Sequence, residues 1–158
     1  MDTDGIKRED NVKEKDLQAD FKRHNIVEGV FELKLIKITE SGKVPPFPFS
    51  SVKDHQIEAL NAANDGSGLY HKISDSFVGD KARGRRFPAP KPFDCLFLKS
   101  VPAYVVVCYY IPRKLKMFCY LQISTFLHMK EISKRLSMPN DLVELMSTYI
   151  LRNGEYVK

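Results

Sequence analysis

Residues 30–36 read Val30-Phe31-Glu32-Leu33-Lys34-Leu35-Ile36, an apolar run that contains one carboxylate and one ammonium group. Side chains alternate across a β-strand, so the odd-numbered positions can face a core while Glu32 and Lys34 point together to the other side. Burying either charge alone would cost on the order of several kcal/mol. We therefore expect the pair to be either an ion pair at a solvated edge or part of a functional site.

The size and charge of the chain set the broad class. Its 158 residues are enough for one domain with a real hydrophobic core. Lys and Arg outnumber Asp and Glu by 25 to 20, which gives a net charge of +5 and an isoelectric point near 9.0. This excess favours a polyanionic partner such as a nucleic acid.

The positive charge is concentrated in residues 81–91, which read KARGRRFPAPK and contain no acidic residue. Glycine and two prolines indicate a flexible arm, and arginine matches the geometry of phosphate groups. The expected phosphate contacts are Lys81, Arg83, Arg85, Arg86 and Lys91. The alternative is a solvated loop without a partner.

The three cysteines, Cys95, Cys108 and Cys119, show no spacing typical of a zinc site. Their apolar neighbours and odd number are typical of reduced core thiols, so we expect an intracellular protein without a signal peptide. The longest apolar run, residues 103–111, is too short to cross a bilayer as a helix, and no membrane association is expected.

The order of elements predicts an α/β fold. Residues 1–25 form a charged segment that we expect to be flexible, with helical tendency near residues 12–21. Residues 26–158 form the domain, in which a Ser51-to-Asp54 capping box starts the first helix. The pattern predicts a mixed β-sheet flanked by helices, with strands at 26–38, 69–73, 93–98, 103–111 and 117–123 and helices at 52–63, 124–135 and 140–152.

Four features resemble the PD-(D/E)xK nuclease superfamily, and in particular the RecU-like Holliday-junction resolvases. They are Glu32-x-Lys34 on a strand, the loop and helix FPFSSVKDHQIEAL at 47–60 with Gln56, the segment KPFDCL at 91–96 with Asp94, and the aliphatic strand from Ala103. The resemblance covers about residues 26–125 and implies a restriction-endonuclease-like sheet. Residues 1–25 and the last two helices have no assigned counterpart.

The chain order departs from that family. The strand with the aspartate usually precedes the Glu-x-Lys strand, whereas Asp94 follows Glu32 by about sixty residues. A circularly permuted version of the same fold accounts for this order, because an active site depends on positions in space. A non-permuted alternative takes the first acid from Asp20 or Glu28, but neither lies in an apolar strand pattern.

The resemblance implies a metal-dependent reaction. Asp94 and Glu32 would bind Mg²⁺ or Mn²⁺, with a main-chain carbonyl and water completing the shell. Lys34 would orient or deprotonate the attacking water, and Gln56 would hydrogen-bond the water, a ligand or the phosphate. Asp75 is either an auxiliary acid or a turn residue. Gln56, like His55, can also be a plain surface residue of the first helical turn.

The resulting expectation is an endonuclease that cuts branched DNA such as four-way junctions, acting as a homodimer with two active sites. Two rivals remain open at this point. One is a nucleic-acid-binding module that keeps the nuclease fold without turnover. The other is a structural domain whose basic loop binds an acidic protein.

Overall fold

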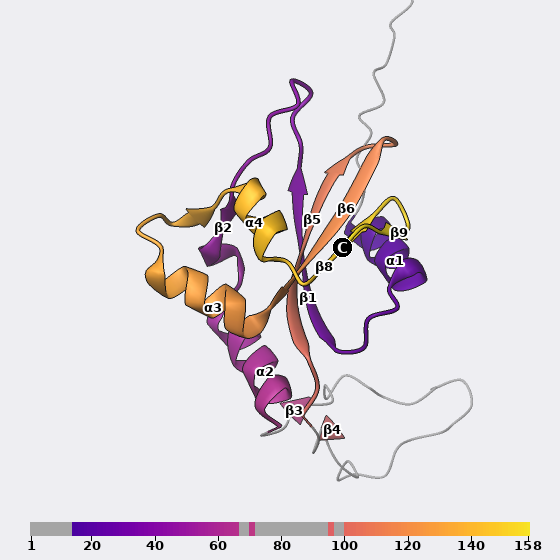
Figure 1. Cartoon of the computed structure of the whole chain (residues 1–158). Helices are drawn as coiled ribbons and strands as arrows, with labels where there is room; N and C mark the ends of the chain where they lie inside the picture. The colour runs from indigo at the N-terminus through magenta and orange to yellow at the C-terminus, as the bar shows by residue number, and fades with distance from the viewer. Residues whose placement is uncertain (1–13, 67–69, 72–94, 97–99) are drawn as a thin grey trace, which may run out of the picture.

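The computed structural model of the chain describes residues 14–66, 70–71, 95–96 and 100–158. Its centre is a five-stranded sheet in the order β1-β5-β6-β8-β9 (Figure 1). The bounds are Val30–Lys37 for β1, Ala103–Ile111 for β5, Leu115–Gln122 for β6, Tyr149–Arg152 for β8 and Glu155–Tyr156 for β9. Strands β1 and β5 are parallel and all other neighbours are antiparallel, which confirms the expected mixed sheet.

Strand β5 lies inside the sheet, and most of its residues are β-branched or aromatic and are covered on both sides. Seven of its nine residues, from Ala103 to Tyr109, are buried. A strand between two helical layers needs this nearly continuous apolar run. The sequence-based prediction of residues 103–111 as a central strand is confirmed.

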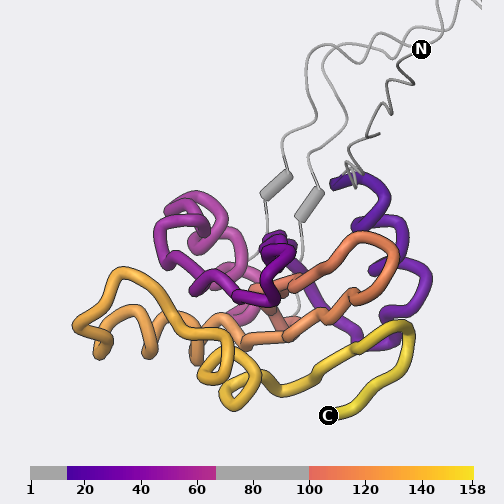
Figure 2. The backbone as a smooth tube through the Cα atoms, turned by 90° about the horizontal axis from the view of Figure 1, so that it is seen from above, coloured from indigo at the N-terminus to yellow at the C-terminus, as the bar shows by residue number. Residues whose placement is uncertain are grey.

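Helices cover both faces of the sheet, as seen from above in Figure 2. Helix α1 (Glu14–His24) packs Leu17 and Phe21 against the face that carries Phe31, Tyr104 and other aromatic residues. Helices α2 (Asp54–Asp65), α3 (Ile123–Ile132) and α4 (Asn140–Met146) pack on the opposite face. The expected α/β arrangement with helices on the sheet is therefore confirmed at this level.

Helix α1 changes the expected domain boundary. Residues 14–24 were included in a flexible segment, but Leu17 and Phe21 are buried in the sheet's aromatic layer. They are four residues apart and lie on one helical face. This part of the segment belongs to the folded domain, and residues 1–13 lie outside the described part of the chain.

Two short ladders lie beside the main sheet. Strand β2 (Phe47–Pro48), followed by the 3₁₀ turn η1 (Phe49–Ser51), pairs with β7 (Ser137–Met138). This ladder ties the loop after β1 to the loop after α3. Strands β3 (Tyr70–His71) and β4 (Cys95–Leu96), within the expected strands at 69–73 and 93–98, pair with each other.

The predicted C-terminal helix over residues 140–152 is wrong beyond Met146. Helix α4 ends where the Ser147 hydroxyl and main-chain N–H both bond to the Val143 carbonyl, at 2.6 Å and 3.0 Å. Residues 149–152 and 155–156 then form a hairpin whose turn, Asn153-Gly154, has positive φ values of 48° and 87°. Asn-Gly between apolar strands is a strong hairpin signal, and it outweighs the helical spacing of Tyr149.

The first predicted helix starts later than expected. Its capping residue is Lys53 rather than Ser51, because the Ser51 hydroxyl bonds to the Pro48 carbonyl at 2.7 Å. The helix α3 predicted to Arg135 ends at Ile132. None of the helices in the described residues combines the length and apolar character needed to cross a membrane.

Two of the cysteines are described with their side chains. Cys108 and Cys119 are buried in neighbouring strands and are free thiols. Burial raises the pKa of each thiol to about 12. Both thiols therefore stay neutral near pH 7, and the expected core position of these two cysteines is confirmed.

Candidate active site

Strand β1 presents Glu32 and Lys34 to the layer that contains α2. The neighbouring even-numbered position, Ile36, belongs to the core on this side, whereas Phe31, Leu33 and Leu35 pack on the α1 side. The strand is terminal in the described sheet, so its polar positions reach solvent. The Glu32 and Lys34 side chains are 27% and 18% exposed, with the Lys34 Nζ 2.9 Å from the Glu32 Oε1.

Gln56 connects this pair to helix α2. Its Nε2 donates to the Glu32 Oε1 at 2.7 Å, and its Oε1 accepts from the Lys34 Nζ at 3.0 Å. The same Oε1 accepts the main-chain N–H of Lys53 at 2.9 Å, which caps the helix. Because both donors face one amide atom, the orientation of the amide is fixed. The three side chains form one closed polar network, which we call the Glu32–Lys34–Gln56 triad.

The local sequence explains why these residues meet. Buried Phe47, Phe49 and Val52 anchor the segment before α2 in the core. The helix then begins at Asp54, which places Gln56 at its third position and within reach of β1. The sequence-based hypothesis that grouped Glu32, Lys34 and Gln56 matches this geometry, and the surface alternative for Gln56 does not, whereas His55 is exposed.

The main chain of β1 adds a second feature to the site. Val30 and Ile38 donate their N–H groups to the β5 side, to Pro102 and Tyr110. Peptide groups alternate along a strand, so those of Phe31, Leu33 and Leu35 point to the opposite edge. Among the described strands, none pairs with that edge. The Leu33 carbonyl therefore lies at an open sheet edge between Glu32 and Lys34.

The remaining expected site residues have different positions. Asp94, Asp75 and the five cations Lys81, Arg83, Arg85, Arg86 and Lys91 lie outside the described residues. Within the described part, β4, which begins directly after Asp94, pairs with β3 and the described neighbour of β1 is β5. The position of Asp94 close to Glu32, which a shared metal ion would require, thus stays a prediction.

The non-permuted alternative finds no support in the described residues. Asp20 lies on α1, on the other side of the sheet, with its carboxylate 3.1 Å from the Lys116 Nζ. Glu28 is exposed in the segment before β1. Neither carboxylate takes part in the Glu32–Lys34–Gln56 triad.

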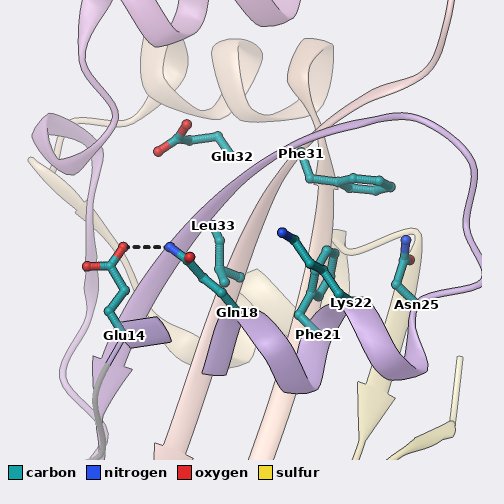
Figure 3. A pocket seen from close by; sticks show the side chains of 8 residues that line it. All are labelled: Glu14, Gln18, Phe21, Lys22, Asn25, Phe31, Glu32 and Leu33. Atoms are coloured by element: carbon teal, nitrogen blue, oxygen red, sulfur yellow. Dashed lines mark hydrogen bonds between the residues drawn. The ribbon is translucent and has the colours of Figure 1, made fainter. Parts of the chain in front are cut away.

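A groove next to β1 contains residues that sequence reasoning missed. It has a volume of about 470 Å³, and Glu14, Gln18 and Lys22 of α1 line it together with residues of β1. Figure 3 shows the 3.0 Å hydrogen bond from Gln18 to Glu14, and Glu32 pointing to the other side of β1. The signal was the four-residue spacing of these polar side chains, which places them on one helical face.

The donor atoms of the site are those that a hard cation prefers, but the described set is incomplete. Gln56 and Lys34 both contact the Glu32 Oε1, and the Leu33 carbonyl lies beside Glu32 in sequence at the open edge. Carboxylate and carbonyl oxygens suit Mg²⁺ or Mn²⁺. Within the described ranges, however, no group of three or more His, Cys, Asp or Glu side chains could hold a metal ion. A complete site therefore requires a further acid, for which Asp94 is the expected residue.

The site cannot be compared with that of a known protein. Comparisons with protein-family models, with curated proteins and with solved structures find no match to this chain.

Proposed function

We propose that the chain is a metal-dependent endonuclease that hydrolyses phosphodiester bonds in branched DNA. The observation that carries the proposal is the Glu32–Lys34–Gln56 triad, in which a carboxylate, an ammonium and an amide from β1 and α2 converge at a partly exposed sheet edge. A structural ion pair needs no amide bridge from a helix and no position at an open edge. The combination matches the residues by which the sequence resembles RecU-like resolvases.

The proposed metal ligands are Glu32 and Asp94, with the Leu33 carbonyl as a main-chain donor. When bound, Mg²⁺ or Mn²⁺ would lower the pKa of a coordinated water and offset charge on the scissile phosphate. Gln56 keeps the Glu32 carboxylate in place by donating to its Oε1, which leaves Oε2 for the cation. In this proposal, the amide holds one carboxylate oxygen of Glu32 and the cation binds the other.

Lys34 would supply a positive charge and hydrogen-bond donors. Its ammonium lies 2.9 Å from Glu32 and 3.0 Å from Gln56, so two acceptors position a group that has three N–H donors. The third donor is available to hold an attacking water or a phosphate oxygen. A fixed cation at this position stabilises the negative charge that develops in the transition state.

The proposed fold is restriction-endonuclease-like, in the permuted order inferred from the sequence. In that arrangement the segment with Asp94 lies next to β1, where the described sheet leaves the edge open. We further propose that the chain acts in the cell as a homodimer, since two-fold symmetry places two sites on a four-way junction. Basic residues 81–91 would contact the phosphates of the DNA arms.

The test is cleavage of a labelled four-way junction by the full chain with Mg²⁺ or Mn²⁺, with and without a chelator. We expect the junction to be cleaved and the chelator to abolish this cleavage. A linear duplex of the same sequence should be cleaved more slowly. Asp94→Asn should reduce the rate by about a hundredfold or more, because it withdraws a charge from the metal site.

Asp16→Asn is the matched control for this substitution, since Asp16 is exposed on α1. It should cleave at the wild-type rate. Absence of cleavage by the wild-type chain with either metal would contradict the proposal.

A further inference from the structure

A second groove lies between the start of α2 and the end of α3, and it is lined by four cationic side chains. Lys53 precedes α2, whereas Lys130, Lys134 and Arg135 come from the last turn of α3 and the segment after it. The volume of the groove is about 520 Å³. Asp54 is the acidic residue in its lining, so positive charge dominates.

The walls of this groove are fixed to each other by the backbone. The N–H of Phe49 donates to the Leu136 carbonyl at 3.1 Å, and the β2–β7 ladder pairs Phe47 with Met138. The rings of Phe49 and Phe126 pack with centroids 5.9 Å apart beneath them. The cations therefore lie on a surface whose main chain is already ordered. Binding of a ligand there loses little main-chain entropy.

Three cations of the groove form no ion pair with a carboxylate of the described residues. Lys34 and Lys116 lie within 3.1 Å of a carboxylate, whereas Lys130, Lys134 and Arg135 have no carboxylate within ion-pairing distance among the described residues. The Lys53 ammonium donates to the Ser50 carbonyl at 3.1 Å, which holds it over the same surface. Neutralisation of these charges is left to solvent or to an anionic ligand.

The groove is connected to the candidate active site through one residue. Lys53 contributes its side chain to the groove, and its main-chain N–H donates to the Gln56 Oε1 of the triad. We propose that the groove binds the phosphodiester backbone of a nucleic-acid arm that continues from the cleaved strand. This inference rests on the proposed function and assigns a substrate contact beyond the arm at residues 81–91.

The exposure of the cations favours a backbone over a small anion. All four side chains are exposed, so none encloses an ion as a dedicated phosphate site would. Exposed lysine and arginine side chains along an open groove instead contact successive phosphates without reading sequence.

The experiment measures binding of a labelled, uncleaved junction in the presence of a chelator, which separates it from any metal-dependent step. The variant is the triple substitution Lys130→Ala, Lys134→Ala and Arg135→Ala. The matched control removes three exposed lysines, Lys37, Lys43 and Lys114, from β1, the loop after it and the β5–β6 turn, away from α3 (Figure 1).

We expect the plot of log affinity against log salt to become less steep in the groove variant, by up to about 3 for duplex arms. The reason is that binding with fewer phosphate contacts releases fewer counterions from the DNA. Affinity near 0.1 M salt should fall by at least about tenfold relative to the control variant. The melting temperatures of both variants should stay close to that of the wild type, because the substituted side chains are exposed.

Three results would overturn the inference. One is an equal salt slope in the groove variant and the control, which would leave the proposed nuclease function intact. Another is suppression of junction binding by millimolar inorganic phosphate, which would assign a small-anion site. The last is competition by polyglutamate as strong as by unlabelled duplex, which would indicate an acidic protein as the ligand of the groove.

Discussion

Strands β1 and β5 are parallel neighbours with opposite environments. In their register Glu32 lies opposite Val105 and Lys34 opposite Val107. Both valines are fully buried, whereas both charged side chains are partly exposed. At these two positions the sheet carries charged side chains where its described edge is open, and apolar side chains one strand further in.

This difference explains how a charged pair fits into an apolar strand. Complete burial of Glu32 and Lys34 would destabilise the fold. Partial exposure to solvent and the hydrogen bonds from the Gln56 amide reduce this cost. The stability of the sheet then comes from β5 and β6, which carry the core on both faces. Strand β1 thus carries its charged side chains at the edge of this core.

Placing a charged residue in β5 and an apolar residue in β1 should produce the largest difference in the free energy of unfolding. Val105→Glu puts a carboxylate into a fully buried position with no partner, and we expect a loss of about 4 kcal/mol or more in the free energy of unfolding. The reciprocal change Glu32→Val should cost about 1 kcal/mol or less, since the pair is partly solvated. Urea unfolding of both variants measures the difference. Equal losses would show that the edge and the centre of the sheet are not distinct environments.

Two buried tyrosines allow a second comparison between strands, with a smaller expected change in stability. The Tyr120 hydroxyl of β6 bonds to the Asn25 Oδ1 at 2.9 Å, but the Tyr109 hydroxyl of β5 has no hydrogen-bond partner in the described structure. Tyr120→Phe should therefore reduce the free energy of unfolding by about 1 kcal/mol, whereas Tyr109→Phe should be neutral or stabilising. Thermal unfolding of the two variants provides the measurement. A larger loss for Tyr109→Phe would mean that the β5 hydroxyl has a partner.

Two members of the triad follow from a local pattern, whereas Gln56 was grouped with them through the resemblance to the nuclease superfamily, since its local pattern also fits a surface residue. Alternation placed Glu32 and Lys34 on one face, and the start of the helix placed Gln56 in its first turn. The central strand was equally clear from its β-branched run. The strands are specified by neighbouring residues, but the contact of Gln56 with β1 joins distant segments, and the local pattern does not show it.

The remaining features depend on contacts between distant segments. Helix α1 owes its order to Leu17 and Phe21 packing on the aromatic layer, which composition alone did not reveal. The C-terminal hairpin forms because β8 pairs with β6, and this pairing overrides the helical spacing of the same residues. The basic groove requires α3 to lie beside the start of α2, a contact that no sequence pattern indicated.

The most direct test of the central claim is the single-turnover rate of junction cleavage by Glu32→Gln, compared with Glu40→Gln. Both substitutions keep size and remove one charge, but Glu40 is exposed beyond the end of β1. If Glu32 binds the metal, its substitution should reduce the rate by about a hundredfold or more, with junction binding retained. The control should cleave like the wild type. A Glu32→Gln rate above about one tenth of the wild-type rate would contradict the assignment of the triad as the catalytic centre.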